Sequence, residues 1–224
     1  MKDRRAVLLD LDDTLYVCRP GEEAGLRAVV AEVSAAVGRP AVEVEAAYRA
    51  ARSAVKARID GRGSSHSRLL YLTEMVHALG RADLLGSVRR WERAFWQAFL
   101  SAVRLRKHTQ TFLEALRRAE KKVAIVTDLT LEVQLWKLEA FGLGPYVDAI
   151  AVSEEVPLDK PEGEIFTLAM ARLGVSAADS VMVGDHDGKD GEGARRLGIP
   201  FVRVTPEDTD GDALLGLARE MGGS

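Results

Sequence analysis

Short apolar runs alternate with longer amphipathic segments through the second half of the chain. The spacing of apolar residues predicts helices over 111–119, 131–141, 162–173 and 191–197, and buried strands over 123–127, 149–153, 181–184 and 201–204. An earlier run, 6–9, is too short for a helix and is bounded by charge, which indicates a buried parallel strand. Alternating strands and helices favour an α/β fold, here a Rossmann-like parallel sheet of five strands flanked by helices.

Residues 16–108 show a different pattern, because apolar residues recur there at helical spacing and no strand competes. The pattern predicts helices over 21–37, 41–59, 66–79 and 83–103, separated by glycine and proline. The strand at 6–9 belongs to the same sheet as the later strands. The helical block is therefore an insertion at 16–108 into a core formed by 1–15 and 109–224.

A cluster of acidic residues follows the first predicted strand. Asp10, Asp12 and Asp13 fall within four positions, and ligands of open α/β sheets bind beyond the carboxyl ends of the strands. Residues two apart in an extended chain point the same way, so the carboxylates of Asp10 and Asp12 can share one small volume. Such a pair favours a hard cation such as Mg²⁺. The alternative is that Asp12 and Asp13 only stabilise the next turn.

Three further polar groups come at or after later strands of the same sheet. Thr127 and Asp128 end one strand, where a hydroxyl and free backbone N–H groups suit a phosphate oxygen. Lys160 follows the next strand and can neutralise a carboxylate or phosphate. Asp185 and Asp190 follow the fourth strand and add acid to the same edge. Each has an ordinary alternative as a cap, a surface lysine or a turn residue, but four sites in this order favour a common function.

Composition sets the broad class. The chain has 224 residues, 47% of them hydrophobic, and one cysteine, Cys18. No apolar run approaches the roughly 20 residues that cross a bilayer, so we expect a soluble protein of the reducing cytoplasm. The net charge is −3, but residues 16–108 carry 16 Lys and Arg against 9 Asp and Glu. A positive insertion beside an acidic core suggests that the insertion handles anions.

With these motifs in place, the chain resembles the haloacid dehalogenase-like hydrolase superfamily, most of whose members are phosphatases. The segment 10–14 matches its first motif, Thr127 its second, Lys160 its third and 184–190 its fourth. The insertion falls where the family carries its helical cap, and the stretch 134–139 is similar to one that recurs among capped members. The resemblance covers the whole chain.

The resemblance implies a role for each motif residue. Asp10 would be the nucleophile, forming an aspartyl-phosphate, and Asp12 the general acid and base. Lys160 would cancel charge repulsion, and Thr127 would hold a phosphoryl oxygen. Thr14, also a candidate substrate-binding residue, would hold the turn of the first motif.

The resemblance also implies a metal cofactor. Mg²⁺ would be held by the Asp10 carboxylate, the Asp12 backbone carbonyl and Asp185, and Asp190 would orient its water shell or the lysine. The implied partner is a small phosphorylated metabolite such as a nucleotide or sugar phosphate, with no nucleic acid or membrane. A monomer or a homodimer is expected.

One departure concerns a candidate substrate-binding residue, Asp128, where the family more often has Asn. A further anion near phosphate costs affinity, so we expect Asp128 to turn away and cap the helix that begins near Thr130. The fourth motif is also unusually rich in charge and glycine.

Three other functions use parts of the same motif set. A 2-haloacid dehalogenase uses no metal, so the acidic set argues against it. A phospho-accepting receiver needs neither a general acid nor an insertion of this size. A phosphosugar mutase would use the same Asp10 and Asp12, and the sequence does not separate it from a hydrolase.

The loop 60–68 of the insertion is the candidate for substrate selection. Glycines flank Arg62, and the Ser, His and Arg side chains that follow suit hydroxyls, carboxylates or a second phosphate. We expect His66 and Arg68 to contact substrate. The alternative is that Ser64 or Ser65 caps the following helix and that the arginines are solvated.

Overall fold

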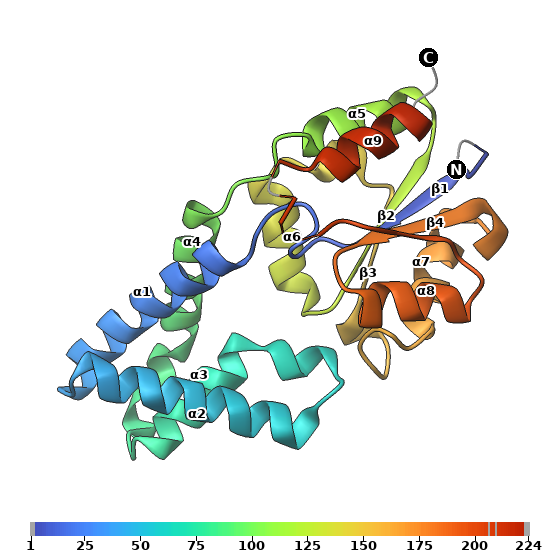
Figure 1. The fold of residues 1–224 in the computed structure, drawn as a ribbon. Helices are drawn as coiled ribbons and strands as arrows, with labels where there is room; N and C mark the ends of the chain where they lie inside the picture. Colours follow the sequence, from blue (N-terminus) through green and yellow to red (C-terminus); the bar gives the residue numbers. More distant parts are fainter. Residues whose placement is uncertain (1–2, 206, 209, 222–224) are drawn as a thin grey trace. The chain divides into compact units, whose positions relative to one another are not determined.

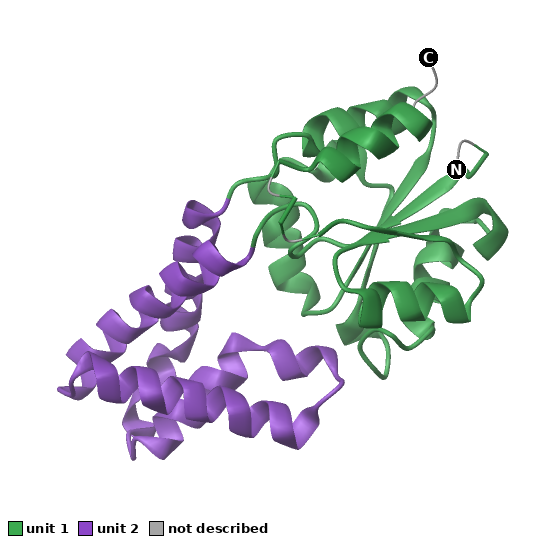
Figure 2. Ribbon diagram, in the orientation of Figure 1, with its two compact units in different colours: residues 1–17, 104–224 green, residues 18–103 purple. Residues whose placement is uncertain are grey.

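The computed structural model describes residues 3–205, 207–208 and 210–221. It divides into two compact units (Figure 2): unit 1 is Met1–Val17 with Arg104–Ser224, and unit 2 is Cys18–Val103. The insertion expected at 16–108 is thus a few residues longer at each end than unit 2.

Unit 1 is built on a parallel sheet of five strands. They are β1 (Ala6–Leu9), β2 (Lys122–Thr127), β3 (Ala149–Val152), β4 (Ser180–Gly184) and β5 (Phe201–Arg203), in the order β3-β2-β1-β4-β5. β1 is central, with Leu9 opposite Ile125 on one side and Val183 on the other. The predicted fold class is confirmed.

Helices cover both faces of this sheet. They are α5 (Thr109–Arg118), α6 (Leu131–Ala140), α7 (Glu164–Leu173), α8 (Glu192–Arg196) and α9 (Asp212–Met221), with 3-10 turns at Gly144–Tyr146, Ser153–Glu155 and Ala177–Asp179 and a π-helical turn at Asp187–Gly191. Figure 1 shows α5 and α9 on one side of the sheet and α7 and α8 on the other. The sequence pattern had not predicted α9, although Leu214, Leu217 and Met221 follow helical spacing and are buried.

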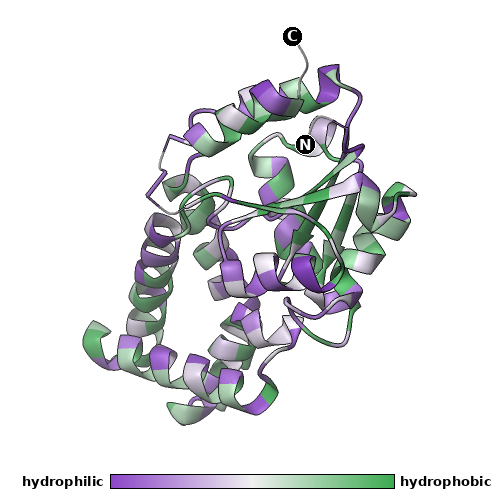
Figure 3. Cartoon of the chain, turned by 45° about the vertical axis from the view of Figure 1, so that its right-hand side comes forward, coloured by the Kyte–Doolittle hydropathy of each residue, from purple (hydrophilic) through white to green (hydrophobic). Residues whose placement is uncertain are grey.

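The core of unit 1 explains the uninterrupted apolar strands. All four residues of β1 are fully buried, and Leu8 packs in one cluster with Ile165 and Phe166 of α7. Because both faces of the sheet are covered, successive side chains are buried whichever way they point. The strands accordingly lie mostly at the hydrophobic end of the colour scale in Figure 3.

Unit 2 is all-helical. It consists of α1 (Arg19–Val37), α2 (Ala41–Ile59), α3 (Arg68–Ala78) and α4 (Val88–Ala102), with 3-10 turns at Gly63–His66 and Ala82–Ser87. The prediction of unbroken helices over 66–79 and 83–103 was wrong at their starts. Ser67 is extended and its hydroxyl accepts a hydrogen bond from the Leu70 N–H, so Ser67 caps α3, not Ser64 or Ser65.

Close packing of α1 on α4 depends on two glycines. A Cβ at Gly21 would lie 2.6 Å from the Phe99 ring, and one at Gly25 would lie 2.8 Å from the Phe95 ring. Both pairs are spaced by four residues, so they stack along one face of each helix. Among the described residues, no helix has both the length and the apolar character that a bilayer crossing requires.

Candidate active site

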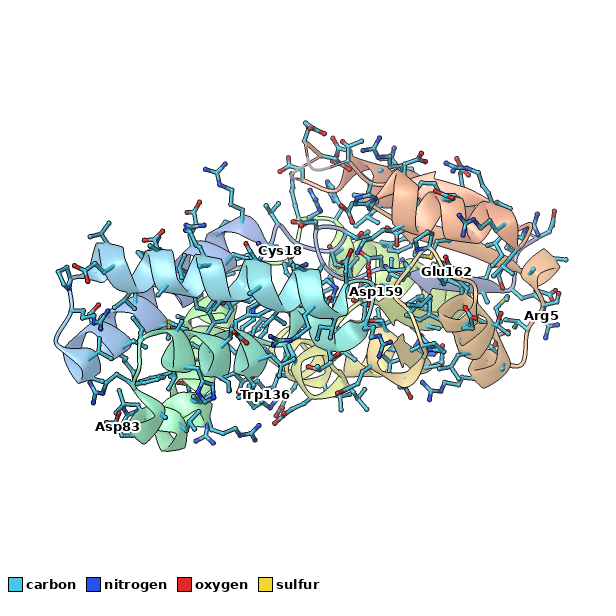
Figure 4. The ribbon with its side chains drawn as sticks, turned by 90° about the horizontal axis from the view of Figure 1, so that it is seen from below. Arg5, Cys18, Asp83, Trp136, Asp159 and Glu162 are labelled. Carbon is cyan, nitrogen blue, oxygen red and sulfur yellow. The ribbon has the colours of Figure 1, made fainter. Side chains whose placement is uncertain are left out.

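The candidate site lies at the carboxyl ends of three neighbouring strands of unit 1. Asp10 follows β1, Thr127 ends β2, and Asp185 follows β4. Because β2 and β4 lie on opposite sides of β1, the strand order reverses at this point, which is where open α/β sheets bind ligands. In Figure 4, Arg5 lies at the amino end of β1, and Asp159, next to Lys160, lies among the loops at the other end.

Asp10 is buried and held by two side chains. Its Oδ1 accepts a hydrogen bond from Lys160 Nζ at 2.7 Å, and its Oδ2 accepts one from Thr14 Oγ1 at 2.7 Å. Burial raises the pKa of Asp10 well above its usual value. The charge of Lys160 opposes this shift, and the carboxylates of Asp190 and Asp185 add to it. Thr14 is buried as well, so Asp10 has a fixed orientation.

Lys160 joins two strand ends through one buried ammonium. Its Nζ lies 2.7 Å from both Asp10 Oδ1 and Asp190 Oδ1 and donates to the Val126 carbonyl at 3.1 Å. Burial disfavours its charge, but the two carboxylates hold the pKa of Lys160 above its ordinary value. Asp190 packs so closely on Gly184 that a Cβ there would lie 2.3 Å from Asp190 Oδ2, which explains the glycine at the end of β4.

Three carboxylates form a group that fits a divalent cation. Asp10, Asp185 and Asp190 each offer an oxygen, and these oxygens lie within 4.8 Å of one another. Burial, together with the neighbouring carboxylates, raises the pKa of Asp185. A hard cation such as Mg²⁺ binds oxygen ligands and would offset the repulsion between these carboxylates. A metal contact of Asp12 through its backbone carbonyl stays a prediction.

The Asp12 carboxylate is held by two side chains of helix α6 and by Tyr16. Lys137 Nζ lies 2.7 and 2.8 Å from its two oxygens, Gln134 Nε2 donates to Oδ2 at 3.1 Å, and the Tyr16 hydroxyl donates to Oδ1. Burial works to raise the pKa of Asp12, but the charge and hydrogen bonds of Lys137 outweigh it and lower that pKa to about 2. In this arrangement Asp12 is a carboxylate.

The loop after β2 contains both a confirmed position and a correction. Thr127 Oγ1 lies at the strand end, as expected, and accepts a hydrogen bond from Gln134 Nε2 at 2.7 Å. The prediction that Asp128 caps the following helix was wrong, since the Leu131 N–H donates to Glu154 Oε2 instead. Glu154 reaches the first turn of α6 from the neighbouring loop.

Asp128 instead connects two other loops. Its Oδ1 accepts a hydrogen bond from the Lys160 N–H at 3.0 Å, and its Oδ2 lies 2.7 Å from Lys189 Nζ. Lys189 lies in the charged fourth motif. The extra acid at 128 is thus matched by a lysine in the motif that also departs from the family pattern.

The two candidates in unit 2 have different surroundings. Arg68 is 9% exposed; its guanidinium pairs with Glu22 and lies 4.8 and 5.0 Å from the ring centres of Trp96 and Phe95. These contacts hold Arg68 inside unit 2. His66 is half-buried in the 3-10 turn before α3. Substrate binding by either residue stays a prediction.

Sequence reasoning missed five residues that contact the site. Tyr16, Gln134 and Lys137 reach Asp12, and Lys189 reaches Asp128. The fifth, Arg106, donates to the carbonyls of Asp13 at 2.6 Å and Thr14 at 2.9 Å. Gln134 and Lys137 fall in the recurrent stretch 134–139, so a signal was present. That signal did not predict which residue these side chains contact, because the face of a helix that meets a strand end is set by the three-dimensional packing.

The family model of the haloacid dehalogenase-like hydrolases matches residues 4–198. The chain belongs to this family. A ribulose-1,5-bisphosphate 5-phosphatase of Halopiger xanaduensis is 36% identical over 205 residues, which are 91% of this chain and 85% of that protein. A glyceraldehyde 3-phosphate phosphatase of Methanocaldococcus jannaschii is 30% identical over 207 residues, which are 89% and 84% of the two chains.

The solved structures agree with this assignment to the haloacid dehalogenase-like hydrolases. The crystal structure of a phosphatase of this family from Thermococcus onnurineus has a TM-score of 0.69 and 27% identity, and the match covers 90% of this chain and 86% of that one. The family resemblance carried by the four motifs is therefore confirmed, together with the fold.

Proposed function

We propose that this haloacid dehalogenase-like hydrolase removes a terminal phosphate from a small phosphorylated metabolite, with Mg²⁺ and an aspartyl-phosphate intermediate on Asp10. The protein is a phosphatase, as predicted. This class is supported by the family model and by relatives that are named as phosphatases and match most of the chain. The observation that carries the mechanism is the buried Asp10 carboxylate, held between Lys160 Nζ and Thr14 Oγ1.

The first step forms a bond between an Asp10 oxygen and phosphorus while the bond to the alcohol oxygen breaks. Two anions approach one another in this step, and the ammonium of Lys160 offsets their repulsion. Asp10, Asp185 and Asp190 would hold Mg²⁺, which supplies the further positive charge that a phosphate dianion requires. The Thr127 hydroxyl and the adjacent N–H groups would receive a phosphoryl oxygen.

Asp12 is the proposed general acid and base. It would give a proton to the departing alkoxide, then take one from the water that hydrolyses the aspartyl-phosphate, which restores its protonation state over one cycle. The ionised Asp12 in this structure corresponds to the state that accepts a proton. In the proposed cycle, Asp12 is in this form just before it deprotonates the hydrolytic water.

The relatives suggest a substrate class. Ribulose 1,5-bisphosphate at its 5-position and glyceraldehyde 3-phosphate each carry phosphate on a primary carbon, next to a carbon that bears a hydroxyl. The two relatives named for these substrates are similar to this chain along more than four fifths of their length. We therefore propose a short sugar phosphate with a terminal ester as the substrate.

A panel of phosphorylated metabolites, assayed with Mg²⁺ for released inorganic phosphate, tests this proposal. We expect the highest kcat/KM for sugar phosphates with a terminal ester and no release with Asp10→Asn. A phosphosugar mutase would instead convert one sugar phosphate into another and release no stoichiometric phosphate. Phosphate release by Asp10→Asn at the wild-type rate would contradict the nucleophile.

A further inference from the structure

Helix α6 places two long polar side chains on the Asp12 carboxylate. Gln134 and Lys137 are three residues apart, so they share one face of the helix. Lys137 Nζ lies 2.7 Å from Asp12 Oδ1 and 2.8 Å from Oδ2, and Gln134 Nε2 lies 3.1 Å from Oδ2. Both carboxylate oxygens therefore have a donor from α6, which fixes the plane of the group as well as its direction.

The Lys137 and Asp12 side chains differ in exposure, as expected if Asp12 reacts with a bound ligand. The Lys137 side chain is 3% exposed, whereas that of Asp12 is 28% exposed. The ammonium therefore approaches Asp12 from the protein side, and the carboxylate keeps an accessible side. A purely structural ion pair needs no such opening, but proton transfer to or from a ligand does.

Gln134 adds a second connection, between the first and second motifs. Its Nε2 donates to Thr127 Oγ1 at 2.7 Å as well as to Asp12, while its Oε1 is buried without a hydrogen-bond partner among the described residues. A rotated amide would place Oε1 against the Asp12 carboxylate, where two acceptors repel. The orientation that leaves Oε1 unpaired is therefore the favoured one, because it lets Nε2 donate to both Asp12 and Thr127.

We propose that Lys137, assisted by Gln134, is a positioning residue for Asp12, and that α6 thereby takes part in proton transfer. The proposal rests on the proposed function, in which Asp12 is the general acid and base. Without Lys137 the carboxylate keeps the neutral donors Tyr16 on Oδ1 and Gln134 on Oδ2 but loses the charged one, so its orientation is held less firmly. A displacement of about 1 Å in a catalytic group can cost about 10²-fold in rate.

The competing role is that Lys137 only fastens α6 to the turn that carries Asp12. That role predicts lower stability and the same loss of activity whether or not residue 12 can transfer a proton. Positioning predicts a loss that depends on the Asp12 carboxylate. A double-mutant cycle separates the two, because groups that act through one another are not additive.

The experiment compares wild type, Lys137→Met, Asp12→Asn and the double variant on an alkyl phosphate, with Mg²⁺ present. We expect Lys137→Met to lower kcat about 10- to 100-fold with little change in KM. In the Asp12→Asn background, the same substitution should lower kcat by less than about twofold. Lys137→Arg keeps the charge and should retain more activity than Lys137→Met.

Two further measurements keep the result decisive. Lys122→Met, the same substitution at the amino end of β2, where Lys122 Nζ donates to the Leu173 carbonyl, should leave kcat unchanged. Thermal unfolding identifies variants that fail to fold; if Lys137→Met is one, the comparison of Lys137→Arg with wild type in both backgrounds takes its place. Equal losses with Asp12 intact and in the Asp12→Asn background would overturn the proposal. If wild type shows no phosphate release that depends on Asp10, the proposed function itself is overturned.

Discussion

The Asp128 carboxylate and the Lys189 ammonium are 2.7 Å apart, and they join the loop after β2 to the loop after β4. Both side chains are partly exposed, so the pair contributes little to stability. Its consequence is electrostatic: a carboxylate next to Thr127, where the phosphate is expected, has its charge balanced by a neighbour.

Removal of Lys189 should therefore weaken phosphate binding. We expect Lys189→Met to raise the inhibition constant of inorganic phosphate about two- to fivefold, because a partly exposed ion pair is worth about 1 kcal/mol or less. Asp128→Asn should restore the wild-type value in that background and change little by itself. A large gain in phosphate affinity from Asp128→Asn alone would mean that its charge faces the phosphate uncompensated.

Magnesium should stabilise the folded protein through the three-carboxylate group. Binding to the folded state alone adds about 2.7 kcal/mol when the ligand is at about 100 times its Kd. We expect Mg²⁺ to raise Tm by several degrees and Asp185→Asn to remove most of that rise. Asp187→Asn, in the same loop but outside the group, is the matched control. Equal Tm shifts in both variants would place the metal elsewhere.

The helical unit should be sensitive to added bulk where α1 meets α4. Gly25→Ala places a methyl group 2.8 Å from the Phe95 ring, and such overpacking costs about 1–3 kcal/mol. Gly216→Ala is the control, since α9 has open space there and the change should be neutral or stabilising. The measurement is the free energy of unfolding in urea; a stable Gly25→Ala variant would show that α1 and α4 can separate at no cost.

Substrate selection by unit 2 can be tested at the two predicted residues. His66→Ala should raise KM for a sugar phosphate while leaving KM for a small aryl phosphate unchanged. Arg68→Ala should lower Tm, because the side chain packs on Trp96 and Phe95 and such contacts are worth about 0.5–2 kcal/mol. Equal changes on both substrates for His66→Ala would remove it from substrate selection.

The sheet was predictable because its signals are local. The run 6–9 is apolar and fully buried, and β4 is likewise short and buried throughout. Parallel strands then bring their carboxyl ends to one edge, so the proximity of Asp10 and Lys160 followed from topology. The details of the helix starts did not follow, since Ser67 and its neighbours compete as caps with similar chemistry.

The partners of Asp12 and Asp128 could not be predicted in the same way. Lys137 is 125 positions from Asp12, and Lys189 is 61 positions from Asp128. Which face of α6 meets the first motif depends on the packing of the helix against the sheet. A charge pattern along the chain shows that acids and lysines are present, but the pairing is set by tertiary structure.

Asp10 is the residue proposed to carry the phosphoryl group, and the most direct measurement is to trap that group there. The Asp12→Asn variant should still transfer phosphate from an activated aryl ester to Asp10. It should hydrolyse the resulting aspartyl-phosphate slowly, because no group deprotonates the water. After acid quenching, we expect peptide mass spectrometry to find a phosphoryl group on Asp10 that hydroxylamine removes. A phosphoryl group found on another residue during turnover would contradict this mechanism. So would an Asp10→Asn enzyme that is as active as wild type and carries no phosphoryl group.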